Sequence, residues 1–60
     1  MDALTAAKMR IISRACVARY TEGERTMNNI VAYYNLSKEN ENYVKEEIIK
    51  IKPDFNFNAE

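Results

Sequence analysis

Apolar residues recur at helical spacing through most of the chain, and this pattern predicts three helices. They return every three or four positions in residues 3–20, and shorter runs with the same period follow in residues 22–34 and 38–51. The pattern predicts an all-α fold, a small three-helix bundle with sharp turns between the helices and an extended C-terminal tail. Residues 1–60 are expected to form a single domain.

The first predicted helix carries two neighbouring apolar stripes. The first consists of Leu4, Ala7, Ile11, Ala15 and Ala18, and the second of Met9, Ile12, Cys16 and Tyr20. Polar residues are expected on the far side, namely Asp2, Arg10, Ser13 and Arg14. An apolar arc this wide exceeds what one neighbouring helix covers. It is typical of a central core helix that touches two neighbours, and the alanine-rich stripe also suits close approach of an identical helix across a dimer axis. The two interpretations can hold together.

The breaks between the predicted helices are marked by capping residues. Thr21 and Glu24 have the spacing of a capping box, in which each side chain bonds the backbone amide of the other. This predicts that the second helix starts directly after Thr21, with almost no loop. At the next break, Asn35 tolerates the left-handed backbone that follows many helix ends, and Ser37 is a favourable N-cap.

The end of the third helix has two interpretations. Val44, Ile48 and Ile51 share one stripe, and Pro53 stops a helix. Apolar and polar residues alternate near the C-terminus, as they do in strands, so a hairpin over residues 48–58 is the alternative. The helical spacing from Val44 favours the helix.

Size makes a further source of stability necessary. A chain of 60 residues buries only about 60% of the surface that its unfolded form exposes. Cys16 is the only cysteine and there is no histidine, so neither an internal disulfide nor a zinc site is available. We therefore expect a homodimer, or a complex with an unidentified protein.

Charge is unevenly distributed although the net charge is zero. Residues 1–20 hold four basic residues and one acidic residue, whereas residues 21–60 hold five basic and eight acidic residues. Such asymmetry favours antiparallel self-association or a charged partner. No signal peptide or membrane-spanning run is visible, and a single unpaired cysteine suits a reducing compartment, so we expect a soluble cytoplasmic protein with no membrane partner.

The composition argues against an enzyme. Without histidine, the Ser-His-Asp and Cys-His arrangements cannot form, and a single glycine, Gly23, cannot build a phosphate-binding loop. Cys16 lies within the apolar arc and is predicted to be structural. We therefore expect no catalytic residue, cofactor, metal site or small-molecule substrate.

The function that this composition favours is a small non-enzymatic regulator or adaptor that binds another protein. It could act as an inhibitor of a larger partner, and its size is typical of bacterial or phage regulators. Aromatic residues are frequent anchors at protein interfaces. The candidate partner-binding residues are the aromatic residues Tyr33, Tyr43, Phe55 and Phe57.

The alternative is a helix-turn-helix regulator of transcription. The succession Asn35-Leu36-Ser37 resembles the turn of helix-turn-helix proteins, and this resemblance implies that the second and third helices bind DNA. The candidate DNA-binding residues are Arg10, Arg14, Ser37, Lys38, Asn40 and Asn42. Aligning Val31 with the buried position of the first helix of that motif places Glu41 at a buried position of the second. The zero net charge also weakens attraction to phosphates, so we favour protein binding.

Overall fold

The chain folds into three α-helices followed by one short 3-10 turn. The computed structural model describes residues 1–60, and it contains α1 (Ala3–Thr21), α2 (Met27–Tyr33), α3 (Lys38–Ile51) and the 3-10 turn η1 (Phe57–Ala59). No residue is in a strand. The predicted all-α three-helix fold is confirmed, and residues 48–58 do not form the alternative hairpin.

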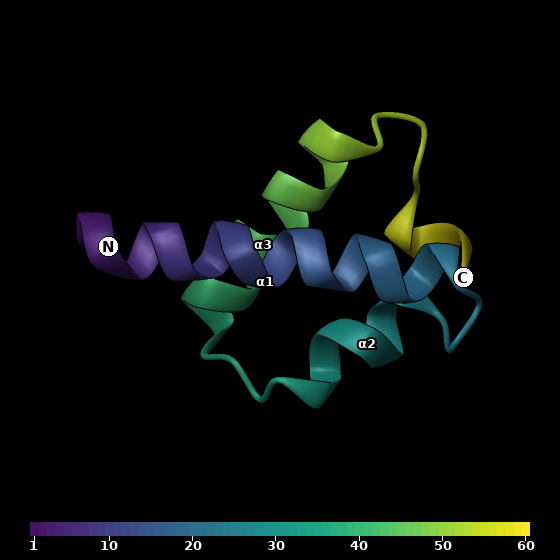
Figure 1. Cartoon of the computed structure of the whole chain (residues 1–60), viewed down its shortest axis with the longest axis horizontal. Helices are drawn as coiled ribbons and strands as arrows, with labels where there is room; N and C mark the ends of the chain where they lie inside the picture. The colour runs from purple at the N-terminus through teal and green to yellow at the C-terminus, as the bar shows by residue number, and fades with distance from the viewer.

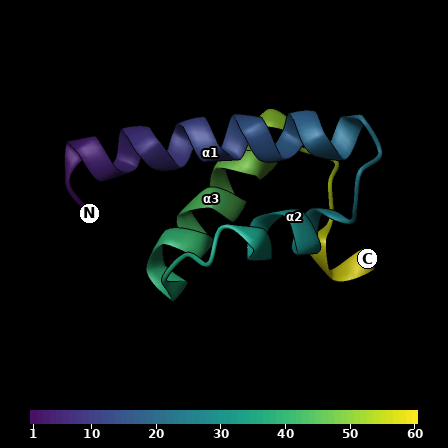
Figure 2. The ribbon, with the colours of Figure 1, turned by 60° about the horizontal axis from the view of Figure 1, so that its bottom comes forward.

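Helix α1 is the longest element and lies across the other two. Both α2 and α3 pack against it, and both lie on the same side of it (Figures 1 and 2). Its first turns project beyond the rest of the molecule, which measures 31 × 22 × 20 Å overall (Figure 1). This arrangement leaves the opposite side of α1 without a neighbour.

Each end of α1 is capped by local sequence. The Asp2 carboxylate accepts a hydrogen bond from the Thr5 amide at 2.7 Å, and this bond lowers the pKa of the Asp2 carboxyl. At the other end, Gly23 adopts the left-handed conformation with φ 80°. Its amide donates to the carbonyl of Tyr20 at 2.9 Å, and the Glu24 amide donates to the carbonyl of Arg19 at 3.2 Å. These two bonds form a Schellman motif, which ends the helix.

The capping box predicted at Thr21 and Glu24 is therefore wrong, and α2 begins five residues later than expected. Thr21 is the last residue of α1, and α2 begins at Met27. Thr26 is its N-cap, with a hydroxyl that accepts from the Asn29 amide at 3.2 Å. Because glycine adopts a positive φ at little cost, the Schellman motif at Gly23 forms here in place of the capping box.

The second break agrees with its prediction. Asn35, which follows the C-cap residue of α2, takes a positive φ of 52°, and Ser37 caps α3 by accepting from the Asn40 amide at 3.3 Å. Residue Lys38 is accordingly the first of α3. The last turn of α3 ends at Ile51, two residues before Pro53.

The core is small and all three helices contribute to it. Its buried apolar residues are Met9, Cys16, Met27, Ile30, Val31, Val44 and Ile48. Partly buried side chains close its edges, among them Ile12 and Tyr20 of α1. The second predicted stripe of α1 therefore faces the core.

Ser13 is buried in this core, contrary to the prediction that it lies on the polar side of α1. It has no exposed surface, and its hydroxyl lies 2.7 Å from the carbonyl oxygen of Met9 and 3.3 Å from that of Val44. The helical count places Ser13 between Met9 and Cys16 on the inner side of α1. Because the Ser13 side chain is short and its hydroxyl is hydrogen-bonded within the core, the backbone of α3 can come close to α1.

Substitutions at Ser13 should separate the effect of size from that of the hydroxyl. We expect Ser13→Ala to lower the free energy of unfolding by only about 1 kcal/mol, because one buried hydroxyl is lost without leaving a cavity. Ser13→Leu should lower it by about 3 kcal/mol, because the larger side chain forces α1 and α3 apart. Urea denaturation followed by circular dichroism measures both values. Equal losses for the two variants would contradict the close packing of α3 on Ser13.

The C-terminal tail folds back onto the end of α1 and the start of α2. The ring of Phe55 packs edge-on against Tyr20 at 5.2 Å and against Phe57 at 4.8 Å between ring centroids. The Glu60 carboxylate accepts from the backbone amides of Met27 and Asn28, each at 2.9 Å. The tail thereby covers one edge of the core and satisfies amides at the start of α2.

Candidate interaction surface

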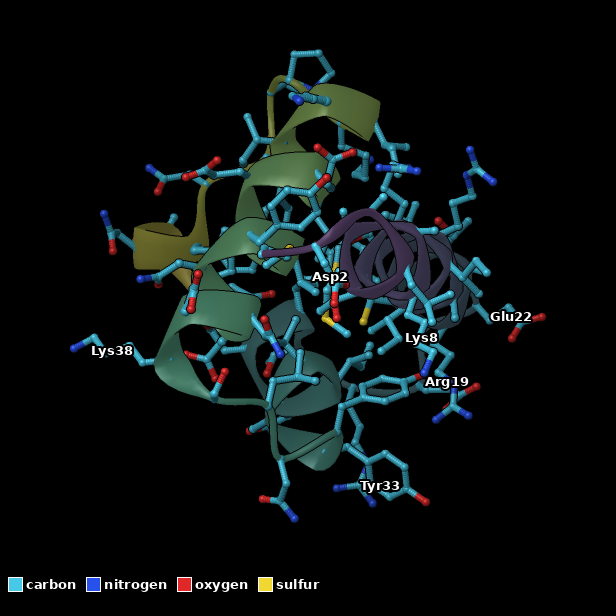
Figure 3. All side chains as sticks on the ribbon, turned by 90° about the vertical axis from the view of Figure 1, so that its left-hand side faces the viewer. Asp2, Lys8, Arg19, Glu22, Tyr33 and Lys38 are labelled. Carbon is cyan, nitrogen blue, oxygen red and sulfur yellow. The ribbon has the colours of Figure 1, made fainter.

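The outer side of α1 carries an aligned row of apolar residues that no other part of the chain covers. Leu4 and Ile11 are 67% and 63% exposed, Ala18 is exposed, and Ala7 and Ala15 are half-buried. We call Leu4, Ala7, Ile11, Ala15 and Ala18 the α1 face. In Figure 3 the view runs along α1, and α2 and α3 lie on one side of it only.

The α1 face is the first of the two stripes expected from the sequence. The prediction that it lies in the core is wrong, because both neighbouring helices pack on the side of Met9 and Cys16. It stays a prediction that an identical helix of a second copy covers the α1 face. Its sequence signal is the seven-residue spacing of Leu4, Ile11 and Ala18, which aligns these residues along a helix.

Basic side chains border the α1 face on both sides. The helical count places Lys8 and Arg19 along one border, and Arg10 and Arg14 along the other. None of the four forms an ion pair, since the three ion pairs of the chain join the Met1 amino group to Glu39, Lys45 to Glu41 and Lys50 to Glu47. The positive charge of α1 is therefore not neutralised within the chain.

Tyr33 extends this surface beyond α1. It is 72% exposed, and its ring packs edge-on against Tyr34 with 5.7 Å between centroids. The Arg19 guanidinium lies 5.7 Å from the centre of the Tyr33 ring and 5.9 Å from that of Tyr34. Figure 3 shows Lys8, Arg19 and Tyr33 on the same side of the molecule. Arg19 thus connects the border of the α1 face to an exposed aromatic ring.

A surface depression lies beside Tyr33, between the end of α1 and α2. Its lining residues are Arg19, Glu24, Arg25, Asn29, Ile30, Ala32 and Tyr33. Two of these are cations and one is an anion, so the depression continues the basic character of the neighbouring border.

The structure does not bring the four candidate aromatic residues together. Only Tyr33 is exposed. Tyr43 is half-buried, and its hydroxyl accepts a hydrogen bond from Arg10 Nη1 at 3.4 Å. Phe55 and Phe57 are half-buried against the core, and the ammonium of Lys45 lies 5.4 Å from the centre of the Phe57 ring. These three residues support the fold, whereas Leu4 and Ile11 provide exposed apolar area that the aromatic candidates do not.

The candidate DNA-binding residues come from two parts of the fold, and two of them, Arg10 and Arg14, lie on α1. Ser37, Lys38, Asn40 and Asn42 lie at the start of α3, where Ser37 is occupied in capping the helix. Glu39 and Glu41 occupy the same turn. Figure 3 shows Lys38 projecting from the side of the molecule opposite to Lys8 and Arg19. The start of α3 therefore does not share one basic surface with Lys8 and Arg19, and its two acids offset the charge of Lys38.

Glu41 does not occupy the buried position that the helix-turn-helix alignment assigns to it. It is half-exposed, and its carboxylate lies 3.8 Å from the ammonium of Lys45, one turn later on α3. The buried positions of α3 are Val44 and Ile48 instead. The core register of α3 thus differs from the register that the resemblance implies.

Cys16 lies in the core with no exposed surface. Burial raises the pKa of its thiol, and the charge of Arg19 opposes this only in part. The neutral thiol is thus the form that the fold favours. The stability that comes from burying the neutral thiol is fully present at pH values below the pKa of the unfolded thiol. This contribution is lost as the pH rises through the higher pKa of the folded state.

Cys16 should therefore report on opening of the core. We expect a thiol reagent at neutral pH to label the native protein at least about a hundredfold more slowly than the urea-unfolded protein, because buried cysteines are inert. The absorbance of the coloured thiolate that the reagent releases gives both labelling rates. Native labelling as fast as that of the unfolded chain would contradict burial of Cys16.

Two further features of interest are metal sites and membrane-spanning helices. No group of three or more cysteine, aspartate or glutamate side chains is placed to hold a metal ion. None of the helices combines the length and apolar character needed to cross a membrane.

Among known proteins, no family model, curated protein or solved structure matches the chain.

Proposed function

We propose that this protein is a small non-enzymatic adaptor or regulator that binds another protein through the α1 face and Tyr33. The observation that carries the proposal is the exposure of Leu4 and Ile11, at 67% and 63%, in one line on the longest helix. An amphipathic helix that presents aligned apolar residues is a recurring mode of protein recognition. Covering one such side chain contributes about 1.5–3 kcal/mol to binding.

A non-enzymatic role is supported by the environment of the reactive residues. Cys16 is the only thiol, and it is buried with a raised pKa. No histidine is present to act as a general base. A free thiol also suits the reducing cytoplasm, where we propose that the protein acts.

A different protein is a better partner for the α1 face than a second copy. In an antiparallel pair of α1 helices, each border faces the same border of the other copy. Arg10 and Arg14 would then meet the same two arginines, and juxtaposed like charges oppose association. We therefore propose a heterologous partner, for which inhibition by occupying a groove is one mode of action. The homodimer predicted from size stays a prediction that sedimentation velocity tests.

A site-specific photo-crosslinker tests the proposed function. We would place a benzophenone side chain at Ile11, which is 63% exposed on the α1 face, and in a control variant at the exposed Lys38 of α3. After irradiation of the cells that naturally make the protein, the Ile11 variant should form a covalent product with one other protein. The Lys38 variant should not form that product, because Lys38 projects from the opposite side (Figure 3).

Two outcomes of this experiment would contradict the proposal. The first is that Ile11 gives no product with another protein. The second is that both positions give the same products, which would indicate contact without a preferred surface.

A further inference from the structure

We infer that the occupant of the α1 face is an acidic amphipathic α-helix of a partner protein. This inference rests on the proposed function and specifies the chemistry of the partner.

The shape of the α1 face fits another helix. Leu4, Ile11 and Ala18 form a straight row about 21 Å long at the rise of an α-helix, which corresponds to about four turns. Ala7 and Ala15 flank this row with short side chains, so the backbone of a second helix can approach closely. The face includes no strand edge to which an extended peptide could add.

The charges on the borders indicate that the partner is acidic. Lys8 and Arg19 on one border, and Arg10 and Arg14 on the other, form no ion pair within the chain. Asp2 is the only acidic residue before α1 ends, and its carboxylate is occupied in capping the helix. A helix with glutamates or aspartates on both sides of an apolar seam would pair with these cations.

Three other occupants fit the face less well. A nucleic-acid backbone would contact the cations but would leave the apolar centre, Leu4 and Ile11, uncovered. An anionic membrane favours helices with large apolar and aromatic residues, and this face has only two large side chains among alanines. A second copy brings four cations against four cations. The acidic helix is the one that matches both the apolar row and its borders.

A pair of matched peptides tests this inference. Both would be helical peptides of about three heptads with leucine and alanine along one seam, and they would differ only in carrying glutamate or lysine beside it. Fluorescence anisotropy should show that the glutamate peptide binds on the order of tenfold more tightly, since each of four exposed charge pairs contributes about twofold. Raising the salt from about 0.05 M to about 0.5 M should remove most of this preference.

Reversing the charge of two border cations on α1 should abolish the choice between the peptides. Lys8→Glu/Arg14→Glu leaves one acid and one base on each border of the α1 face, so this variant should bind the two peptides equally. The control Lys38→Glu/Lys50→Glu changes the net charge equally on α3 and should still prefer the glutamate peptide. Circular dichroism of each variant verifies that the helices remain folded.

Equal binding of the two peptides to the unsubstituted protein would overturn the acidic specificity while leaving the proposed function intact. Binding of neither peptide would overturn the inference as well. The inference would also be overturned if phosphatidylserine vesicles or random duplex DNA occupied the α1 face. Self-association through this face in sedimentation velocity would overturn it too. Failure of the proposed function is detected separately, by loss of the protein crosslink at Ile11.

Discussion

Replacing Ile48 with alanine is expected to remove about half of the free energy of unfolding. Ile48 has no exposed surface and is one of the largest buried side chains. Truncating such a residue lowers the free energy of unfolding by about 2–5 kcal/mol, because apolar contacts are lost and a cavity remains. A domain of this size has a total stability of only about 3–9 kcal/mol. The midpoint of thermal unfolding should fall by at least about 10 °C.

Ile51→Ala on the same helix is the matched control. Ile51 is 45% exposed and lies three residues further along α3. Its truncation should lower the free energy of unfolding by no more than about 1 kcal/mol, because less apolar area leaves water. Thermal unfolding followed at 222 nm compares the two variants. Equal losses at both positions would show that α3 does not present Ile48 to the core.

The double substitution Leu4→Gln/Ile11→Gln should abolish binding without affecting the fold. Both residues are exposed, and glutamine is as good a helix former as leucine, so the free energy of unfolding should change by only about 0.5 kcal/mol. Removing the two large apolar side chains of the α1 face should weaken binding of the glutamate peptide by about 2–4 kcal/mol, or at least thirtyfold.

Ile51→Gln provides the control for this binding experiment. It removes a partly exposed isoleucine from α3, which lies outside the α1 face. Its peptide affinity should equal that of the unsubstituted protein. If Ile51→Gln weakens binding as much as the double substitution does, apolar exposure in general, and not the α1 face, determines binding.

Much of the fold could be predicted from the sequence because the core-facing residues of α3 keep strict helical spacing. Val44 and Ile48 are both buried as expected, and Ser37 caps the helix that carries them. Ile51, the third residue of the predicted stripe, is 45% exposed because it lies in the last turn of the helix. The start of α2 could not be predicted with equal success, because two capping motifs overlap at Gly23. Local sequence permits both a capping box and a Schellman motif there, and the structure forms the second.

The candidate surface was visible in the sequence only in part. The wide apolar arc of α1 indicated that the helix has more apolar surface than one neighbour can cover. Which stripe is buried depends on where α2 and α3 pack, and this is set by contacts between distant residues, such as Ser13 with Val44. The aromatic candidates were misleading for a similar reason, since the tail folds back and half-buries Phe55 and Phe57.

The central claim is that α1 presents one apolar stripe to the core and the other to an acidic helix. Titration of the isotope-labelled protein with the glutamate peptide, followed by amide chemical shifts, tests it most directly. We expect the largest changes along Leu4, Ile11 and Ala18, small changes at Val44 and Ile48, and none at Lys38. Changes concentrated at the start of α3, or spread evenly over all three helices, would contradict the claim.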